Sequence, residues 1–236
     1  MLALFSHLVE QVPTAVPMRV ARLTMDLPRG VPMRPLRSRY RMVRQGKRIQ
    51  LVDVMLDDGD VEVARVSALS IHTGGSVDVP REPNRRAAPP APPTRGGGAP
   101  FGADIEGRDP TSTPGFVLAF SGERVAGEHG DGVPSITWFT LRCQIVAGHP
   151  VTPLGRVAAA SDFVSGLATF LDFSRQASIN PDLSLHLLRE PVGEWVAVDA
   201  AYQMEHDGIA QARGFLFDEV GHLGTALTSA MAFTHV

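Results

Sequence analysis

The chain has 236 residues, of which 44% are hydrophobic and 20% charged, and its formal net charge at pH 7 is −3. This composition predicts a globular protein with a substantial buried core, and the weak negative charge gives no electrostatic reason to expect nucleic acid or an anionic membrane as a partner. The single cysteine, Cys143, excludes an intramolecular disulfide and a thiolate metal cluster, and the apolar run around it predicts a buried, inert thiol.

The N-terminal residues 1–12 lack both the basic segment and the small-residue cleavage site of a signal peptide. No apolar stretch of the sequence approaches the roughly 18 residues that a membrane-spanning helix needs. We therefore expect a soluble, cytoplasmic protein.

The first part of the chain predicts one helix followed by antiparallel strands. Residues 1–12 have a helical apolar pattern, and residues 19–27 alternate apolar with polar side chains. Long strands over 37–45 and 48–71 follow, with hairpin turns at "QGK" and "DDGD".

Arginine and lysine are concentrated at residues 37–48, where they occupy six of twelve positions. The favoured interpretation is that they form the solvated faces of a strand pair and its turn. A polyanion site, or contact with the phosphates of a nucleotide-like ligand, is the alternative.

Proline and glycine dominate residues 74–115, and large apolar side chains are nearly absent there. This composition predicts a linker or a long surface crossover with extended polyproline segments. It divides the chain into a first domain at 1–73 and a second at 116–236.

The second part repeats the pattern of the first. Strand-like sequence at 115–120 and 135–146 precedes a helical pattern at 158–173, and an alternating strand at 183–190 leads into a meander that ends near residue 233. Residues 46–71 align with 208–233 at an offset of 162, and residues 23–29 align with 183–189 at an offset of 160.

A helix that is apolar nearly all round, followed by an antiparallel meander, predicts a sheet wrapped around a buried helix. The sequence thus predicts an α+β protein made of two such units. The first unit has no counterpart of the strands that open the second, so we expect an exposed sheet edge and, through it, a homo-oligomer.

Asp162 is the one charged residue in the stretch "VAAASDFVSGLATF" at 157–170. An unpaired buried carboxylate costs several kcal/mol, so the residue either caps a helix N-terminus or serves chemistry. At an offset of 160 its counterpart in the first half is Leu2, which indicates that the architecture itself does not require an acid there.

Other polar residues in the second half have simpler interpretations beside a functional one. Asn180 precedes a proline and is typical of a turn, although its amide could hold a water molecule. Asp182, Ser184 and His186 share one strand face, which favours an exposed polar surface. Arg189 lies at the end of a strand.

The chain resembles the double-hotdog acyl-CoA thioesterases, namely the bacterial thioesterase II group and the actinobacterial thioesterase-like proteins of the same superfamily. The most specific motifs are "SDF" at 161–163 and "NPDLSLHLLREPVGEW" at 180–195. The resemblance covers most of the chain outside the linker. It implies a double hotdog fold. The sequence departs from that pattern at its start, where the first hotdog lacks an opening strand, so we expect that hotdog to be truncated at its N-terminus.

The resemblance also implies a set of site residues. The carboxylate that orients or activates the attacking water would be Asp162, and its partner on the next strand would be Asn180. The family's last-strand glutamine falls at Thr228, or at Leu227 in another alignment, and no glutamine is present there. Ser184 and Arg189 are candidates for binding the substrate.

Two functional hypotheses follow from this resemblance. The first is hydrolysis of acyl-CoA thioesters without a metal or cofactor, with coenzyme A as part of the substrate. The second is an acyl-CoA or acyl-chain binding protein without hydrolysis, which the missing glutamine and the shortened first half favour. A protein that only oligomerises is a third possibility, and failure to bind any acyl-CoA would indicate it.

Overall fold

The computed structural model describes residues 1–75, 89, 91–93, 101, 115–128, 132–172 and 175–234. Most of the segment expected to be a linker, 74–115, lies outside these residues. In chain order the elements are α1 (Leu2–Glu10), β1 (Met18–Asp26), β2 (Arg37–Gln45), β3 (Ile49–Asp58), β4 (Val61–His72), α2 (Gly115–Leu118), β5 (Phe120–Ala126), β6 (Ser135–Leu141), α3 (Pro153–Ser161), α4 (Val164–Leu167), β7 (Gln176–Ile179), β8 (Asp182–Leu187), β9 (Val196–Met204), β10 (Ile209–Asp218) and β11 (Gly221–Thr234).

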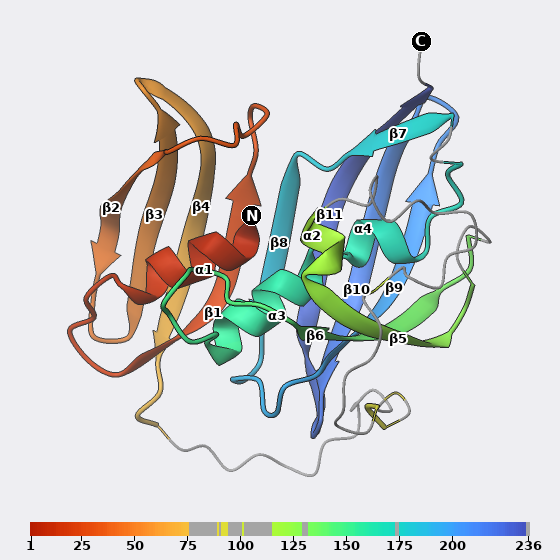
Figure 1. Ribbon diagram of the computed structural model, residues 1–236. Helices are drawn as coiled ribbons and strands as arrows, with labels where there is room; N and C mark the ends of the chain where they lie inside the picture. The colour runs from red at the N-terminus through yellow and green to blue at the C-terminus, as the bar shows by residue number, and fades with distance from the viewer. Residues whose placement is uncertain are drawn as a thin grey trace.

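The described strands form one sheet that runs through both halves (Figure 1). Its order is β2-β3-β4-β1-β8-β11-β10-β9-β6-β5, with β7 paired to the far end of β11. The helices lie on one face of this sheet (Figure 1). The expected pair of antiparallel meanders around helices is confirmed, and the two halves join where β1 pairs antiparallel with β8.

The register at this junction relates the halves by a pseudo-twofold axis. Thr24 lies opposite Ser184, 160 positions further along the chain, and Met25 lies opposite Leu183. The offset of 160 expected for these strands is therefore the one that the sheet adopts.

The hairpins follow the same offset, which corrects the expected offset of 162 for residues 46–71. Asp58 pairs with Val61 and Asp218 with Gly221, and each hairpin has an irregularity one pair earlier, between Leu56 and Asp57 or between Leu216 and Phe217. The offset of 162 aligned glycines rather than turns. Gly59 occupies the first turn position with a positive φ of 62°, whereas Gly221 follows its turn, so the two glycines are not equivalent.

Two further local expectations were wrong. Residues 115–118 form the short helix α2 instead of a strand. Cys143 is exposed because β6 ends at Leu141, and the apolar run around the cysteine does not continue the strand.

The helices α1 and α3 pack directly on each other in the centre of the helix layer (Figure 1). A Cβ atom on Gly155 of α3 would lie 2.8 Å from Ile145 Cδ1 and 3.6 Å from Ser6 Oγ of α1, so the glycine permits the close approach of the helices. The core between helices and sheet is aliphatic and aromatic, with Leu2, Phe5, Val157 and Ala158 fully buried.

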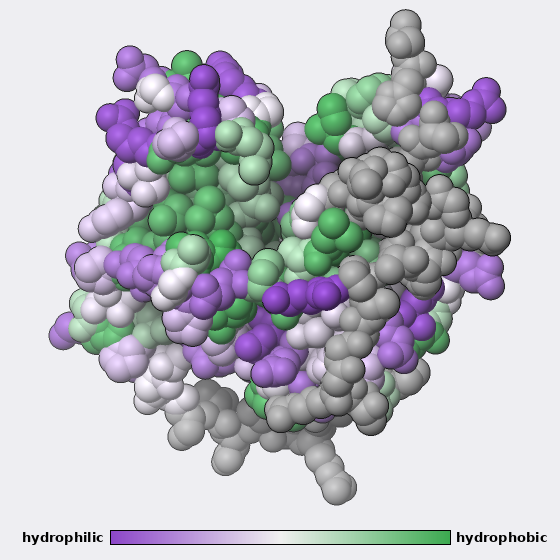
Figure 2. Space-filling model, in the orientation of Figure 1, coloured by the Kyte–Doolittle hydropathy of each residue, from purple (hydrophilic) through white to green (hydrophobic). Residues whose placement is uncertain are grey.

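The first half has less cover than the second. Among the helices of the described residues, α1 alone lies over its strands, whereas α2, α3 and α4 lie over the second half (Figure 1). Figure 2 shows hydrophobic surface beside α1 on this side of the first-half strands. At the sheet's edge, β2 pairs with β3 alone among the described strands, and all its residues except Met42 are exposed.

Candidate active site

The two central helices run antiparallel, and at each end a C-terminal acid of one helix meets the N-terminal residue of the other. Asp162 Oδ2, directly after α3, lies 3.3 Å from the Met1 amino nitrogen, directly before α1. At the opposite end, Thr152 Oγ1, directly before α3, donates a hydrogen bond of 2.8 Å to Glu10 Oε2, the last residue of α1. The helix pair thus has one carboxylate near each end, although Glu10 is the last residue of α1 and Asp162 is the C-cap of α3, the position that Gln11 occupies in α1.

Asp162 is the C-cap of α3, not a helix N-cap as the capping alternative required. The helix begins at Pro153, and its N-cap is Thr152, whose hydroxyl accepts from Gly155 N–H at 3.0 Å. The dipeptide Thr152–Pro153 carried the signal, because threonine is a preferred N-cap and proline a preferred first helical residue. Asp162 therefore does not cap the N-terminus of its own helix. Its carboxylate lies instead at the N-terminal residue of α1, and its side chain is 18% exposed.

A cluster of phenylalanines fixes the chain immediately after Asp162. Phe163 stacks on Phe139 with ring centres 4.2 Å apart and planes at 8°, and it meets Phe120 edge to face at 4.8 Å. Phe116 of α2 also stacks on Phe163, with the two ring centres 5.0 Å apart. The position of Asp162 is thus coupled to strands β5 and β6 through its neighbour's ring.

We expect Phe163→Ala to lower the free energy of unfolding by about 3–5 kcal/mol, because it removes a buried ring at the centre of an aromatic cluster. Urea unfolding followed by circular dichroism measures the change. Phe163→Leu, which keeps most of the apolar volume, should cost clearly less. Equal stability of the alanine variant and the wild type would show that this cluster does not support the junction.

Thr228 is fully buried and lies on the inner face of β11. Its hydroxyl is within hydrogen-bonding distance of two backbone carbonyls, 2.6 Å from Asp182 O and 3.0 Å from Ser229 O. Asn180 is half-buried between β7 and β8. The short helix α4, which begins two residues after Asp162, packs on β9, β10 and β11, the strand of Thr228.

Ser184 and Arg189 are not part of this arrangement. Ser184 lies on the outer face of the sheet, between Thr24 and the 44%-exposed Leu227. Asp182 lies on that face too, where its carboxylate accepts from Ser229 N–H at 2.7 Å. The structure thus separates the residues expected to bind substrate from Asp162 and Thr228.

Arg189 is held by an acid at the β10–β11 turn. Its guanidinium forms a two-point ion pair with Asp218, one bond of which measures 2.6 Å, and it also donates to the backbone oxygens of Gly221 and His222. Burial acts to raise the pKa of Asp218, but hydrogen bonds from Arg189 and from the N–H groups of Val192 and Val220 outweigh it and lower that pKa. Arg189 is therefore committed to a structural pair.

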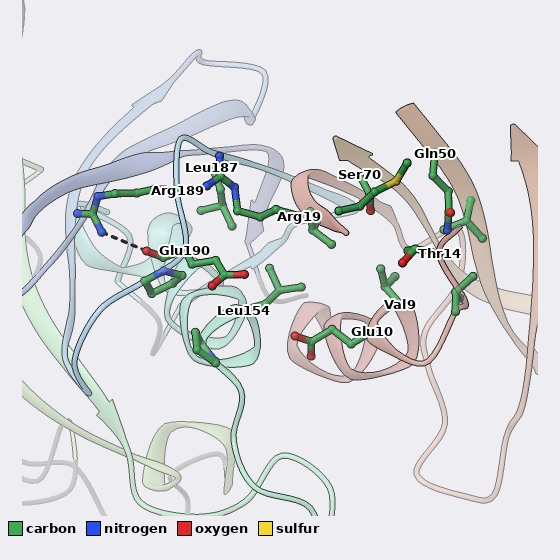
Figure 3. Close-up of a pocket in the computed structure, with 16 residues that line it drawn as sticks. Val9, Glu10, Thr14, Arg19, Gln50, Ser70, Leu154, Leu187, Arg189 and Glu190 are labelled. Carbon is green, nitrogen blue, oxygen red and sulfur yellow. Dashed lines mark hydrogen bonds between the residues drawn. The ribbon is translucent and has the colours of Figure 1, made fainter. Parts of the chain in front are cut away.

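A cavity of about 260 Å³ lies at the other end of the helix pair, beside Glu10 (Figure 3). Aliphatic side chains of both halves line it, together with Glu10, Gln50, Ser70 and Arg189. Sequence reasoning missed this cavity. The one signal in the sequence is Glu10, an acid at the end of the first predicted helix.

The basic stretch at 37–48 faces acids on neighbouring strands. Arg39 forms an ion pair with Asp57 at 2.6 Å and another with Glu62 at 3.0 Å, and Arg41 pairs with Asp53 at 2.6 Å. These pairs support the interpretation as a solvated strand face, because much of the positive charge is locally neutralised.

Models of protein families match both halves of the chain. The model described as the acyl-CoA thioesterase C-terminal domain matches residues 83–231, and that described as the N-terminal domain matches residues 1–71. The chain belongs to the acyl-CoA thioesterase family. The predicted resemblance is thereby confirmed, and the two halves of this thioesterase-family chain correspond to the two domains of the family.

Solved structures show the same fold at low sequence identity. An acyl-CoA thioesterase II, TesB2, from Mycobacterium marinum has a TM-score of 0.68 at 16% identity, covering 99% of this chain and 86% of that one. A conserved protein of unknown function with a hot dog fold from Alicyclobacillus acidocaldarius has a TM-score of 0.72 at 13% identity, with the same coverage. A tesB protein from Mycobacterium avium subsp. paratuberculosis has a TM-score of 0.62 at 16% identity, covering 93% and 80%.

The double hotdog fold predicted for this thioesterase-family chain is confirmed by these likenesses. Among curated proteins, no match was found. Within the described residues, no cluster of histidine, cysteine and acidic side chains is arranged to hold a metal ion, and none of the helices is long and apolar enough to cross a membrane.

Proposed function

We propose that this protein hydrolyses acyl-CoA thioesters at the junction of α3 and α4, with Asp162 as the general base. Membership of the acyl-CoA thioesterase family supports the reaction class. The observation that carries the assignment to this junction is the largely buried carboxylate of Asp162 in an otherwise apolar segment. A positioned carboxylate can accept the proton of an attacking water molecule.

Thr228 would hold that water as an acceptor. Because its hydroxyl hydrogen is directed to a backbone carbonyl, the threonine oxygen presents lone pairs to other groups. A water molecule that donates one hydrogen to Asp162 and the other to Thr228 has its own lone pair free for the thioester carbonyl carbon. The Asn180 amide would donate to the water or to the thioester oxygen.

In the reaction, the water oxygen forms a bond to the thioester carbon while its proton passes to Asp162. The tetrahedral intermediate then collapses, the carbon–sulfur bond breaks, and the coenzyme A thiolate takes up the proton. The products are a carboxylic acid and free coenzyme A, and no cofactor takes part.

The test is the release of free thiol from short-chain and long-chain acyl-CoA by the purified full-length chain. Turnover well above the uncatalysed rate supports the proposal. An unchanged thioester after prolonged incubation with every chain length contradicts it.

The alternative is an acyl-CoA binding protein without hydrolysis. The absence of glutamine from β11, together with a Thr228 hydroxyl already directed to the backbone, favours it. This alternative predicts saturable heat of binding in calorimetry and quantitative recovery of the intact thioester afterwards.

Thr228→Val should reduce turnover roughly threefold to tenfold, since it removes one neutral hydrogen bond to the attacking water. Thr228→Ser keeps the hydroxyl and should retain most of the activity. Initial rates of thiol release at saturating acyl-CoA measure both. If valine and serine variants are equally active, Thr228 does not hold the water.

A further inference from the structure

The cavity beside Glu10 lies at the pseudosymmetric counterpart of the Asp162 end. Asp162 follows the last residue of α3 and contacts the residue before α1, and Glu10 ends α1 and contacts the residue before α3. The expected counterpart of Asp162, Leu2, instead begins α1. The connection from helix to strand differs in length between the halves, so the offset of the strands does not apply to the helices.

Glu10 is exposed, but its carboxylate is held by the Thr152 hydroxyl rather than free. Desolvation by the neighbouring protein raises its pKa, the Thr152 hydrogen bond lowers it, and the negative charge of Glu190 raises it, with a net upward shift. The same Thr152 oxygen accepts from Gly155 N–H. The Glu10 carboxylate is thus positioned by the N-terminus of α3 at the rim of the cavity.

The deeper wall of the cavity carries an unsatisfied acceptor. Gln50 of β3 is 2% exposed, and its Nε2 atom donates to Pro13 O at 3.3 Å. Its Oε1 atom has no hydrogen-bond partner among the described residues. Buried polar groups are normally paired, so this acceptor can take a hydrogen bond from a donor placed in the cavity.

The polar character of this wall is not required by the fold. At the offset of 160 set by the sheet register, Gln50 corresponds to Ala210 and the buried Ser70 corresponds to Ala230. The second half therefore forms the same hairpin with methyl groups at both places. Figure 3 shows Gln50, Ser70 and Thr14 together on the right, Glu190 on the left, and Glu10 below the middle of the view.

Much of the remaining lining is aliphatic, although Arg19, Arg189 and Glu190 also line the cavity. Side chains of both halves contribute, namely Val9, Val12, Val20, Val52, Leu154 and Leu187. With about 260 Å³ the cavity is smaller than sites that enclose a whole drug-sized ligand, which occupy roughly 300–1,000 Å³. It has room for the acyl part of a thioester, while a coenzyme would remain outside.

We propose that this cavity is a second acyl-thioester site, selective for acyl chains that carry a hydroxyl group, with Gln50 Oε1 accepting from the hydroxyl and Glu10 acting as general base at the rim. The water oxygen attacks the thioester carbon and Glu10 takes its proton. The carbon–sulfur bond then breaks and the proton passes to the leaving thiolate. The hydrolytic step rests on the proposed function, whereas the binding selectivity does not.

The binding test compares 3-hydroxyoctanoyl-CoA with octanoyl-CoA by calorimetry, using the full-length chain. The wild type should bind the hydroxylated thioester about threefold to tenfold more tightly, as expected for one neutral hydrogen bond. Gln50→Met should remove this preference, with Gln50→Leu as a second variant. Gln203→Met, at an exposed glutamine of β9, is the matched control and should keep the preference.

Thermal unfolding adds an independent readout. Replacing an orphaned buried amide by an apolar side chain of similar volume should leave the Gln50→Met variant at least as stable as the wild type. A wild type without preference for the hydroxylated thioester, or a Gln50→Met variant that retains it, overturns the selectivity.

The catalytic part is tested by thiol release from the hydroxylated thioester. Asp162→Asn should retain a residual turnover that Asp162→Asn/Glu10→Gln loses, whereas adding the exposed Glu205→Gln instead should change nothing. Complete loss of turnover in Asp162→Asn alone overturns the role of Glu10. If the wild type has no turnover but Gln50 still sets the binding preference, the proposed function fails and the binding site stands.

Discussion

Asp162→Asn should lower the turnover of acyl-CoA by about 10²–10⁴-fold, the usual contribution of a positioned general base. Asparagine has nearly the same shape and keeps one oxygen acceptor, but it cannot take up the proton of the attacking water. Its side chain still fits between α3 and α4, so the fold should be retained. Initial rates of thiol release, together with a thermal melt, separate loss of chemistry from loss of structure.

The residual rate of this variant is informative because a second carboxylate lies at the other end of the helix pair. The matched control is Asp53→Asn, which removes an acid that pairs with Arg41 on the outer face of the first half. That variant should keep the wild-type rate. Full activity in Asp162→Asn with octanoyl-CoA would remove Asp162 from the proposed chemistry.

The strands and turns of both meanders could be predicted from the sequence because their signals are local. Alternation of apolar and polar side chains marked β1 and β8, and short polar turns marked the hairpins. Register was harder to predict. The glycines at 59 and 221 suggested an offset of 162, but one lies within its turn and the other after it.

The ends of the helices were harder to predict from the sequence. The alanine run at 158–160 suggested a helix that begins there, but it lies within α3. The stronger signal for the start of the helix was Thr152 before Pro153. Asp162 was correctly expected to lie largely out of solvent, but it ends its helix instead of beginning it. That error concealed the fact that each end of the helix pair carries an acid, since it assigned Asp162 to the wrong end of its helix.

The partners of Arg189 could not be predicted from neighbouring residues. Asp218 lies 29 positions away, and the two meet only because the β8–β9 connection folds back onto the β10–β11 turn. The charge of Arg189, which was expected from the sequence to bind the substrate, is thus already matched by that of Asp218. The segment from Arg189 to Pro191 lines the cavity beside Glu10, so this pair also shapes that wall.

The Arg189–Asp218 pair should dominate the stability of this corner. The Asp218 side chain is fully buried and that of Arg189 is 26% exposed. Removing one partner of a buried pair typically costs about 3–5 kcal/mol, because the other charge remains buried and unpaired. We expect Arg189→Met to lower the free energy of unfolding in urea by about this amount. Arg189→Met/Asp218→Leu should recover part of the loss, since neither charge then remains.

The same pair predicts how stability depends on pH. The pKa of Asp218 is lowered in the folded protein, so the unfolded state binds more protons between the two pKa values. The stabilisation is therefore complete above the unfolded value of about 4 and is lost as pH falls through the folded value. Urea unfolding of the wild type and Asp218→Asn from pH 7 downward measures this. The difference in unfolding free energy should be constant near neutrality and shrink below about pH 4, and a difference that stays constant into that acidic range would show that the Asp218 charge does not stabilise the fold.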